Sequence, residues 1–284
     1  MKQSGFYKLS PKYANLVKQI GGLYRDDKER PVYCCIQDKD YPKIYWAIPT
    51  SSISIRPFEQ LNRIKKLCTL PDRDIRSCYY HIGHTNRPAI FKISNVLPVT
   101  NDCIDGEYTS QGKHLVLRDK RLIAEITRKL SRILFDESRH PDKYEQRISS
   151  TCAFLKGEMR DKIMHQYLGK TVTVTIDRPI GSSHPKYSDM VYPVNYGYIE
   201  GIISADCEEQ DVYVLGVNEP LKFFTGKVIA AIRRENDVED KWVVAPNESR
   251  LTRNEISESV KFQEQYFVSR IAQFLPADDG GLCP

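Results

Sequence analysis

The sequence predicts an α+β protein of two domains. Its 284 residues exceed one ordinary domain. Residues 1–163 hold 30 Lys and Arg against 19 Asp and Glu, a net charge of +11, whereas residues 164–284 hold 12 against 18, a net charge of −6. Both halves mix short runs of β-branched and aromatic residues with amphipathic helical patterns. We therefore expect one domain at 1–163 and another at 164–284.

In the basic half, a short strand at 6–9 precedes a helix that Ser10 and Pro11 open and that runs to about Gln19. The longest helical pattern begins at Asp119, which is a good cap, and ends near Phe135. Further strands are expected at 31–36, 44–48 and 89–93.

The acidic half begins after a boundary region at 149–168. Strict alternation of apolar and polar residues at 170–176 predicts a half-buried strand. Thr252 and Glu255 form a capping-box pattern that opens a long helix, which we expect to reach Phe274. Strands are expected at 213–215, 228–232 and 242–244, and a loose tail at 276–284.

Two classes of protein are disfavoured by the sequence. Apolar runs such as 228–232 are too short to span a membrane, and the first five residues lack the apolar core of a signal peptide. The eight cysteines include no C-x-x-C pair, which favours free thiols in a reducing compartment over a disulfide or zinc framework. We therefore expect a cytoplasmic protein that does not enter a membrane.

A tyrosine-rich segment, Tyr192-Pro-Val-Asn-Tyr196-Gly-Tyr198, is predicted to form a rigid turn that presents phenol groups. Ten residues after Tyr196 begins an acidic loop that contains Asp206, Glu208 and Asp211. Carboxylates at this spacing can converge on one hard cation such as Mg²⁺, which also binds substrate phosphates. The alternative is an acidic loop that is only solvated.

This combination resembles the metal-dependent soluble inorganic pyrophosphatases with a five-stranded barrel, over about Leu168 to Phe267. The resemblance implies a small OB-like β-barrel with a long C-terminal helix, Mg²⁺ as cofactor, and pyrophosphate or a related phosphoanhydride as substrate. It assigns metal binding to Asp206, Glu208 and Asp211, with Glu208 also orienting the attacking water. In the second acidic segment the ligands are taken as Glu239 and Asp240, although Glu235 and Asp237 are open alternatives. It assigns substrate binding to Lys186, Tyr192, Tyr196, Lys241 and Tyr266.

The sequence departs from that family at several cationic positions. No arginine stands at the family's phosphate-clamping position before Tyr192, and Phe267 replaces a lysine. Fewer cations weaken the stabilisation of a transferring phosphate. Two possibilities follow: a hydrolase of some phosphoanhydride, or a degenerate relative that only binds metal and phosphate.

Two segments of the basic half carry a second pattern. Residues 6–13, near the N-terminus, are rich in aromatic side chains and end at Tyr13. Residues 46–52 place Thr50 and Ser51 where a strand is expected to end. Hydroxyl and backbone N–H groups at a strand end can hold a phosphate, although a plain turn explains them equally.

Together with Thr151-Cys-Ala-Phe154, these segments resemble ToxN and AbiQ, the endoribonuclease toxins of type III toxin–antitoxin systems, over about residues 5–159. The resemblance implies a Kid/MazF-like SH3-type β-barrel with added helices and cleavage of RNA without a metal. A 2′-hydroxyl would attack the adjacent phosphate. Tyr13, Thr50 and Ser51 would be catalytic, with Arg30 or Lys28 in place of one family lysine, while Ile53 replaces another. The implied partners are substrate RNA and a small antitoxin RNA, with which the protein would assemble.

Two hypotheses for the whole chain follow. The first is a fusion of an RNA-cleaving toxin with a Mg²⁺-dependent phosphoanhydride hydrolase. The alternative is a non-catalytic RNA-binding module joined to a degenerate metal- and phosphate-binding barrel.

Overall fold

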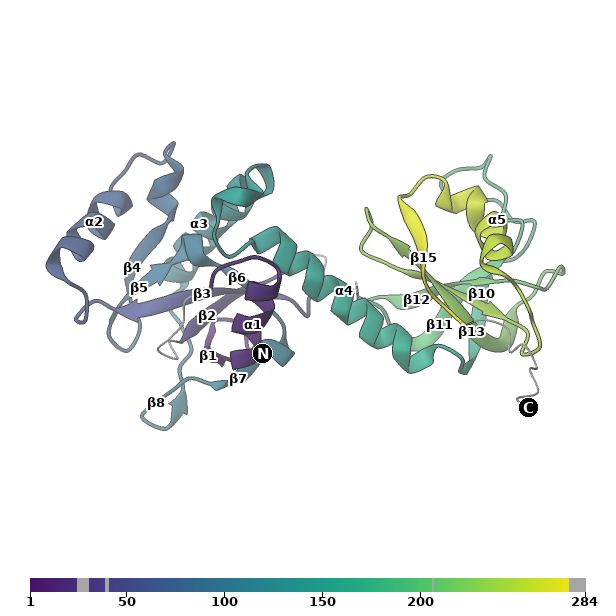
Figure 1. Cartoon of the computed structure of the whole chain (residues 1–284), viewed down its shortest axis with the longest axis horizontal. Coiled ribbons are helices and arrows are strands. Elements are labelled where there is room, and N and C mark those ends of the chain that lie inside the picture. The colour runs from purple at the N-terminus through teal and green to yellow at the C-terminus, as the bar shows by residue number, and fades with distance from the viewer. Residues whose placement is uncertain (25–30, 39–40, 206, 276–284) are drawn as a thin grey trace. The chain divides into compact units, whose positions relative to one another are not determined.

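The computed structural model describes residues 1–24, 31–38, 41–205 and 207–275. The chain divides into two compact units, Met1–Lys156 and Gly157–Pro284, each described below by itself (Figure 1). The division lies seven residues before the predicted boundary, within helix α4 (Ile148–Tyr167).

The N-terminal unit is built around a mixed set of short strands and three further helices (Figure 1). Its helices are α1 (Pro11–Gln19), α2 (Phe58–Cys68) and α3 (Lys120–Arg139). Its strands are β1 (Gly5–Leu9), β2 (Val32–Gln37), β3 (Tyr45–Ser52), β4 (Tyr80–His84), β5 (Pro88–Lys92), β6 (Leu97–Val99), β7 (Ile104–Glu107), β8 (Thr109–Ser110) and β9 (Lys113–His114).

Seven of these strands form a sheet in the order β4-β5-β3-β2-β1-β7, with β6 also paired to β3. Strand β3 is the longest of them and changes partners along its length. Residues 45–47 pair with β6, whereas residues 50–52 pair with β5. This change of partner brings Thr50 and Ser51 to the point where β3 passes from one partner strand to the other, which positions the candidate site of this unit.

The C-terminal unit contains a closed five-stranded β-barrel. Neighbouring strands pair in the ring β10-β11-β12-β14-β13, and β13 returns to β10. All of these pairings are antiparallel except β12 with β14. The strands are β10 (Thr171–Arg178), β11 (Asn195–Ile203), β12 (Glu209–Val214), β13 (Phe223–Arg234) and β14 (Lys241–Ala245).

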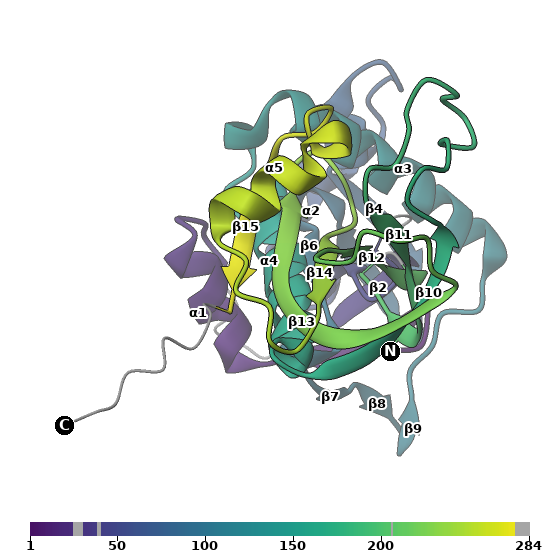
Figure 2. The ribbon, with the colours of Figure 1, turned by 90° about the vertical axis from the view of Figure 1, so that its right-hand side faces the viewer.

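Helices cover this barrel on two sides. The last turns of α4 insert Met164 into the barrel core and place the Tyr167 ring 5.4 Å from that of Trp242. On another side lies α5 (Arg253–Glu264), which packs Ile256 and Val260 onto the barrel (Figure 2). It is followed by β15 (Ser269–Phe274), which pairs with the second half of β13.

Several predicted elements are confirmed. Ser10 caps α1 by accepting a hydrogen bond from the Lys12 amide, and Asp119 caps α3 in the same way. The alternating segment at 170–176 forms most of β10. The α+β class is confirmed, and the barrel of the acidic half is closed as expected. The SH3-type barrel of the basic half stays a prediction, and the tail at 276–284 lies outside the described residues.

Two predicted elements are wrong. The tyrosine-rich segment does not form a turn throughout, because Asn195 begins strand β11. The final helix does not reach Phe274 but ends at Glu264, and residues 269–274 form strand β15. Within the part of the chain that is described, no helix is both long enough and apolar enough to cross a membrane.

Candidate active site

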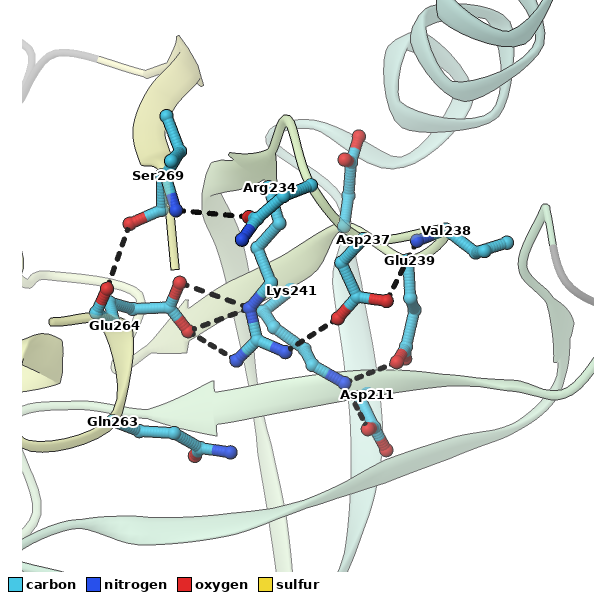
Figure 3. Close-up of polar contacts among 12 residues, drawn as sticks. Asp211, Arg234, Asp237, Val238, Glu239, Lys241, Gln263, Glu264 and Ser269 are labelled. Atoms are coloured by element: carbon cyan, nitrogen blue, oxygen red, sulfur yellow. Dashed lines mark hydrogen bonds and ion pairs between the residues drawn. The ribbon is translucent and has the colours of Figure 1, made fainter. Parts of the chain in front are cut away.

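Four side chains meet where strands β11, β12 and β14 lie side by side in the barrel. The Tyr196 hydroxyl donates to Asp211 Oδ2 at 2.5 Å, and Lys241 Nζ donates to the same oxygen at 2.5 Å. Lys241 also forms an ion pair with Glu239 (Figure 3). The side chain of Asp211 is 29% exposed, so this group is open to solvent on one side while Lys241 is buried. Four of the residues that the sequence motifs singled out, Tyr196, Asp211, Glu239 and Lys241, therefore lie together, and their roles stay a prediction.

Asp240 does not join these residues. It is buried, and its two carboxylate oxygens accept from Arg160 at 3.0 Å and from Arg233 at 3.1 Å. Successive side chains of an extended segment point to opposite sides. Glu239 and Lys241 therefore share one side and Asp240 takes the other, which corrects the expectation that Asp240 binds metal.

Arg178 is a site residue that the sequence reasoning missed. Its guanidinium lies 4.9 Å from the centre of the Tyr196 ring, and its Nη1 donates to the Tyr192 hydroxyl at 3.3 Å. Arg178 ends strand β10, directly before Pro179. The sequence feature that could have identified Arg178 is its position at the end of the strand predicted from the alternating pattern. It supplies a cation beside the tyrosines, where the sequence had indicated that none was present.

Gly197 explains how these strands approach one another. A Cβ at this residue would lie 1.9 Å from the Thr175 carbonyl oxygen, far inside contact distance. Only glycine permits this crossing of β10 and β11. The crossing holds Arg178 of β10 close to Tyr196 of β11.

A buried ion network supports the site from the side of α5 (Figure 3). Arg234 donates from Nε to both oxygens of Glu264 at 3.1 Å and from Nη1 to Asp237 at 3.1 Å. The Tyr213 hydroxyl donates to Glu264 at 2.7 Å. These contacts join β12, β13 and α5. Burial raises the pKa of the Tyr196 and Tyr213 phenols well above the usual value, and the nearby carboxylates Asp211 and Glu264 raise it further.

The remaining predicted residues of this half lie around the cluster. Tyr192 is buried against Tyr196, with ring centres 5.5 Å apart. Glu208 is exposed, and its carbonyl accepts from the Ser204 amide at 2.8 Å in a tight loop. Lys186 and Tyr266 are also exposed, on a loop and just after α5 respectively. Asp206 lies outside the described residues.

The carboxylates present suit a hard divalent cation. Asp211 and Glu239 offer oxygen donors, the type that Mg²⁺ prefers, and both are already held beside a cationic group. Among the described residues, no three His, Cys, Asp or Glu side chains are arranged as a metal-binding group.

A second candidate site lies in the N-terminal unit, at the end of β3. Thr50 and Ser51 line a pocket of about 280 Å³ together with polar residues of the β4–β5 turn. These are Thr85, Asn86 and Arg87. The Thr50 hydroxyl donates to the Pro31 carbonyl at 2.8 Å. Ser51 Oγ accepts from Arg56 Nη2 at 3.0 Å, which leaves the serine proton to donate elsewhere.

Arg56 is the residue that sequence reasoning missed here. It follows Ile53, the residue that replaces a lysine of the resembled toxins, and the Arg56 amide donates to the Ile53 carbonyl in a turn. The turn brings the guanidinium back to Ser51, a residue of the pocket wall. The cation that lines the pocket itself is Arg87.

Tyr13 does not line this pocket. It is fully buried on α1, and its hydroxyl donates to the Pro98 carbonyl at 2.8 Å. Burial raises the pKa of the Tyr13 phenol well above its usual value. The expected meeting of Tyr13 with Thr50 and Ser51 is therefore corrected, because Tyr13 packs in the core. Arg30 and Lys28 lie outside the described residues.

Comparison with known proteins found a similarity for the C-terminal unit. Residues 157–277 match the family model described as inorganic pyrophosphatase. This part of the chain resembles that family and is called the pyrophosphatase-like domain. The match begins at Gly157, the first residue of the C-terminal unit.

Solved structures were also compared with the chain. The inorganic pyrophosphatase from Neisseria gonorrhoeae is 22% identical over 40% of this chain and 90% of its own, with a TM-score of 0.30. That from Coxiella burnetii is 16% identical over 38% and 86%, with a TM-score of 0.30. That from Thermus thermophilus is 17% identical over 38% and 83%, with a TM-score of 0.28. No curated protein matched the sequence.

Proposed function

We propose that the pyrophosphatase-like domain hydrolyses phosphoanhydrides, with pyrophosphate as the simplest substrate and Mg²⁺ as cofactor. The observation that supports this most directly is the contact of Asp211 with both Tyr196 and Lys241. It places a carboxylate, a phenol and an ammonium at one partly exposed position. A family match over residues 157–277 points to the same chemistry.

Each side chain then has a defined task. Asp211 and Glu239, with Asp206 and Glu208 of the acidic loop, would hold Mg²⁺, which supplies charge neutralisation and a more acidic water. Lys241 and Arg178 stabilise negative charge on the phosphate oxygens. Tyr192 and Tyr196 fix the position of Arg178 through their rings and the Tyr192 hydroxyl. Glu208, on its exposed loop, accepts a proton from the attacking water.

The test is phosphate release from pyrophosphate by the purified full-length protein with Mg²⁺. We expect Asp211→Asn to lower kcat/KM about a hundredfold or more, since it removes a charge that no neighbour replaces. Glu258→Gln is the matched control, because this carboxylate is exposed on α5, where it pairs with Lys261. Absence of phosphate release by the wild type would reject the proposal.

For the N-terminal unit we propose RNA binding and cleavage without a metal at the pocket of Thr50 and Ser51. The supporting observation is that the pocket wall holds both the Ser51 hydroxyl, which accepts from Arg56 and keeps its own proton to donate, and the cationic side chain of Arg87. The +11 charge of residues 1–163 favours a polyanionic ligand. The 2′-hydroxyl oxygen would bond to phosphorus as the bond to the 5′-oxygen breaks, and that oxygen takes up a proton.

This proposal is tested by incubating the full-length protein with RNA in the presence of EDTA. We expect fragments that end in cyclic phosphate, and about a hundredfold slower cleavage by Ser51→Ala. Ser138→Ala, on the exposed surface of α3, is the matched control. RNA that is bound but remains intact would favour the non-catalytic alternative, and an antitoxin RNA would then have no cleavage to inhibit.

A further inference from the structure

The pyrophosphatase-like domain also has a cavity that includes Tyr266, one of the predicted substrate-binding residues, but none of the residues given a task in the hydrolysis above. It has a volume of about 710 Å³ and lies between the loop at 184–191 and the end of α5. Its walls include five rings, those of His184, Tyr187, Phe262, Tyr266 and Phe267. Asp189 is the one acidic or basic side chain, histidine aside, among its described lining residues. Such walls suit a planar, largely uncharged group better than a phosphate.

Tyr192 separates this cavity from the phosphate-binding cluster. On one side its hydroxyl accepts from Arg178, and its ring lies against Tyr196. On the other side its ring stacks with His184 at 6.1 Å, nearly parallel, and meets Phe262 edge to face at 5.3 Å. One buried side chain therefore contacts both the anion-binding residues and two residues of the cavity wall, which places the cavity and the cluster on two sides of the same ring.

The cavity also has features that would orient a ring. Phe267 is held by Arg234, whose guanidinium carbon lies 3.7 Å from the ring centre. Gln263 lies beside Tyr213, with its Oε1 3.0 Å from the Tyr213 hydroxyl oxygen. Its amide nitrogen and the Gln265 side chain can pair with the polar edge of a heterocycle. Tyr187 is 63% exposed and offers its ring at the mouth of the cavity.

From these contacts we infer that the cavity binds the base of a nucleoside diphosphate whose phosphates occupy the site of Arg178, Tyr196 and Lys241. This inference rests on the proposed function and names a substrate class for it. In the reaction, a water oxygen bonds to one phosphorus and the bond from that phosphorus to the bridging oxygen breaks. The products are a nucleoside monophosphate and inorganic phosphate, which together carry the protons of the water.

The test measures binding by the full-length protein with Mg²⁺, by equilibrium dialysis. The probes are the α,β-methylene analogues of ADP, GDP, CDP and UDP, which do not hydrolyse, and methylenediphosphonate, which lacks a base. We expect at least one nucleotide analogue to bind about tenfold more tightly than methylenediphosphonate, the gain from stacking one base on aromatic side chains. Tyr187→Ala should remove this advantage and Tyr187→Phe should keep it.

Phe223→Ala is the matched control, since Phe223 is equally exposed but lies on β13 outside the cavity. It should leave the ratio of the two dissociation constants unchanged. The inference is overturned if no nucleotide analogue binds more tightly than methylenediphosphonate, or if Tyr187→Ala preserves the advantage.

A parallel assay separates this inference from the proposed function. Hydrolysis of pyrophosphate without any nucleotide advantage rejects the base site and leaves the hydrolase intact. Nucleotide binding that depends on Tyr187, without hydrolysis of pyrophosphate or of ADP, GDP, CDP and UDP, supports the base site and rejects the hydrolase.

Discussion

The side chains of three consecutive residues, Glu239, Asp240 and Lys241, lie in two different environments. Lys241 and Glu239 pair with each other beside Asp211, whereas Asp240 neutralises two buried arginines. The acidic motif pointed to this segment, but it did not indicate that Glu239 and Asp240 lie on opposite sides of the strand. The missing information is the register of an extended strand, which tertiary packing fixes.

The Tyr196 hydroxyl is expected to keep Asp211 in place through their short contact. We expect Tyr196→Phe to lower kcat/KM for pyrophosphate about tenfold, because a hydrogen bond to a charged group is lost while the ring remains packed. The measurement is steady-state phosphate release. Tyr198→Phe serves as control, because Tyr198 lies two residues further along β11 and is half-buried. An equal loss in that variant would contradict a specific role of the Tyr196 hydroxyl.

The positive charge of Arg178 is expected to lower the pKa of the His184 imidazole. Partial burial, Arg178 and Lys186 lower the pKa of the His184 imidazole below 6.5, since each disfavours its cationic form. We therefore expect Arg178→Gln to raise that pKa, as measured by NMR titration of the imidazole protons. Lys261→Gln, on α5 and paired with Glu258, should leave it unchanged. A pKa that does not move in Arg178→Gln would contradict the proximity of the two groups.

Among the elements, the strictly patterned ones were predictable and the ambiguous ones were not. The alternation at 170–176 allowed one interpretation, and the structure has a strand there. In contrast, Ile271 and Phe274 continued the helical spacing of α5 but instead pair with β13. Hydrogen bonding to an open edge of β13 outweighs local helical spacing, and neither the edge nor its position is visible in sequence.

The N-terminus of α5 offers a direct test of that element. Thr252 and Glu255 form the reciprocal capping box that the sequence predicted. We expect Thr252→Ala to lower the free energy of unfolding by about 1 kcal/mol, because the Glu255 amide loses its acceptor. Chemical denaturation measures this change. Thr171→Ala, exposed at the start of β10, is the control for loss of a hydroxyl, and equal destabilisation in both would argue against a capping effect.

At the scale of the whole molecule, the predicted boundary falls inside a helix. The change in net charge after residue 163 indicated two domains, but α4 runs continuously from Ile148 to Tyr167. Arg160 of this helix donates to Asp240 and to the carbonyls of Arg234 and Asp237. The helix segment from Gly157 onward thus belongs to the C-terminal unit, and charge counting does not detect such contacts.

This boundary predicts a difference between two shortened chains. We expect residues 157–284 to be more stable than residues 164–284 by about 3 kcal/mol, since the shorter chain lacks Arg160 and leaves part of the charge on buried Asp240 uncompensated. Thermal unfolding of the two chains measures this difference. In the longer chain, Arg160→Met should reproduce most of the loss. Equal stability of both chains would place the boundary where the charge changes.

The ammonium of Lys241 between Asp211 and Glu239 has a consequence for how the protein would acquire its cofactor. The Lys241 ammonium already neutralises part of the charge of Asp211 and Glu239. A divalent ion that binds these two carboxylates would therefore have to displace the ammonium. Such competition weakens metal affinity but keeps the acids assembled when metal is scarce. Binding of a divalent ion by these acids would also release Lys241, whose ammonium would then be able to contact a phosphate.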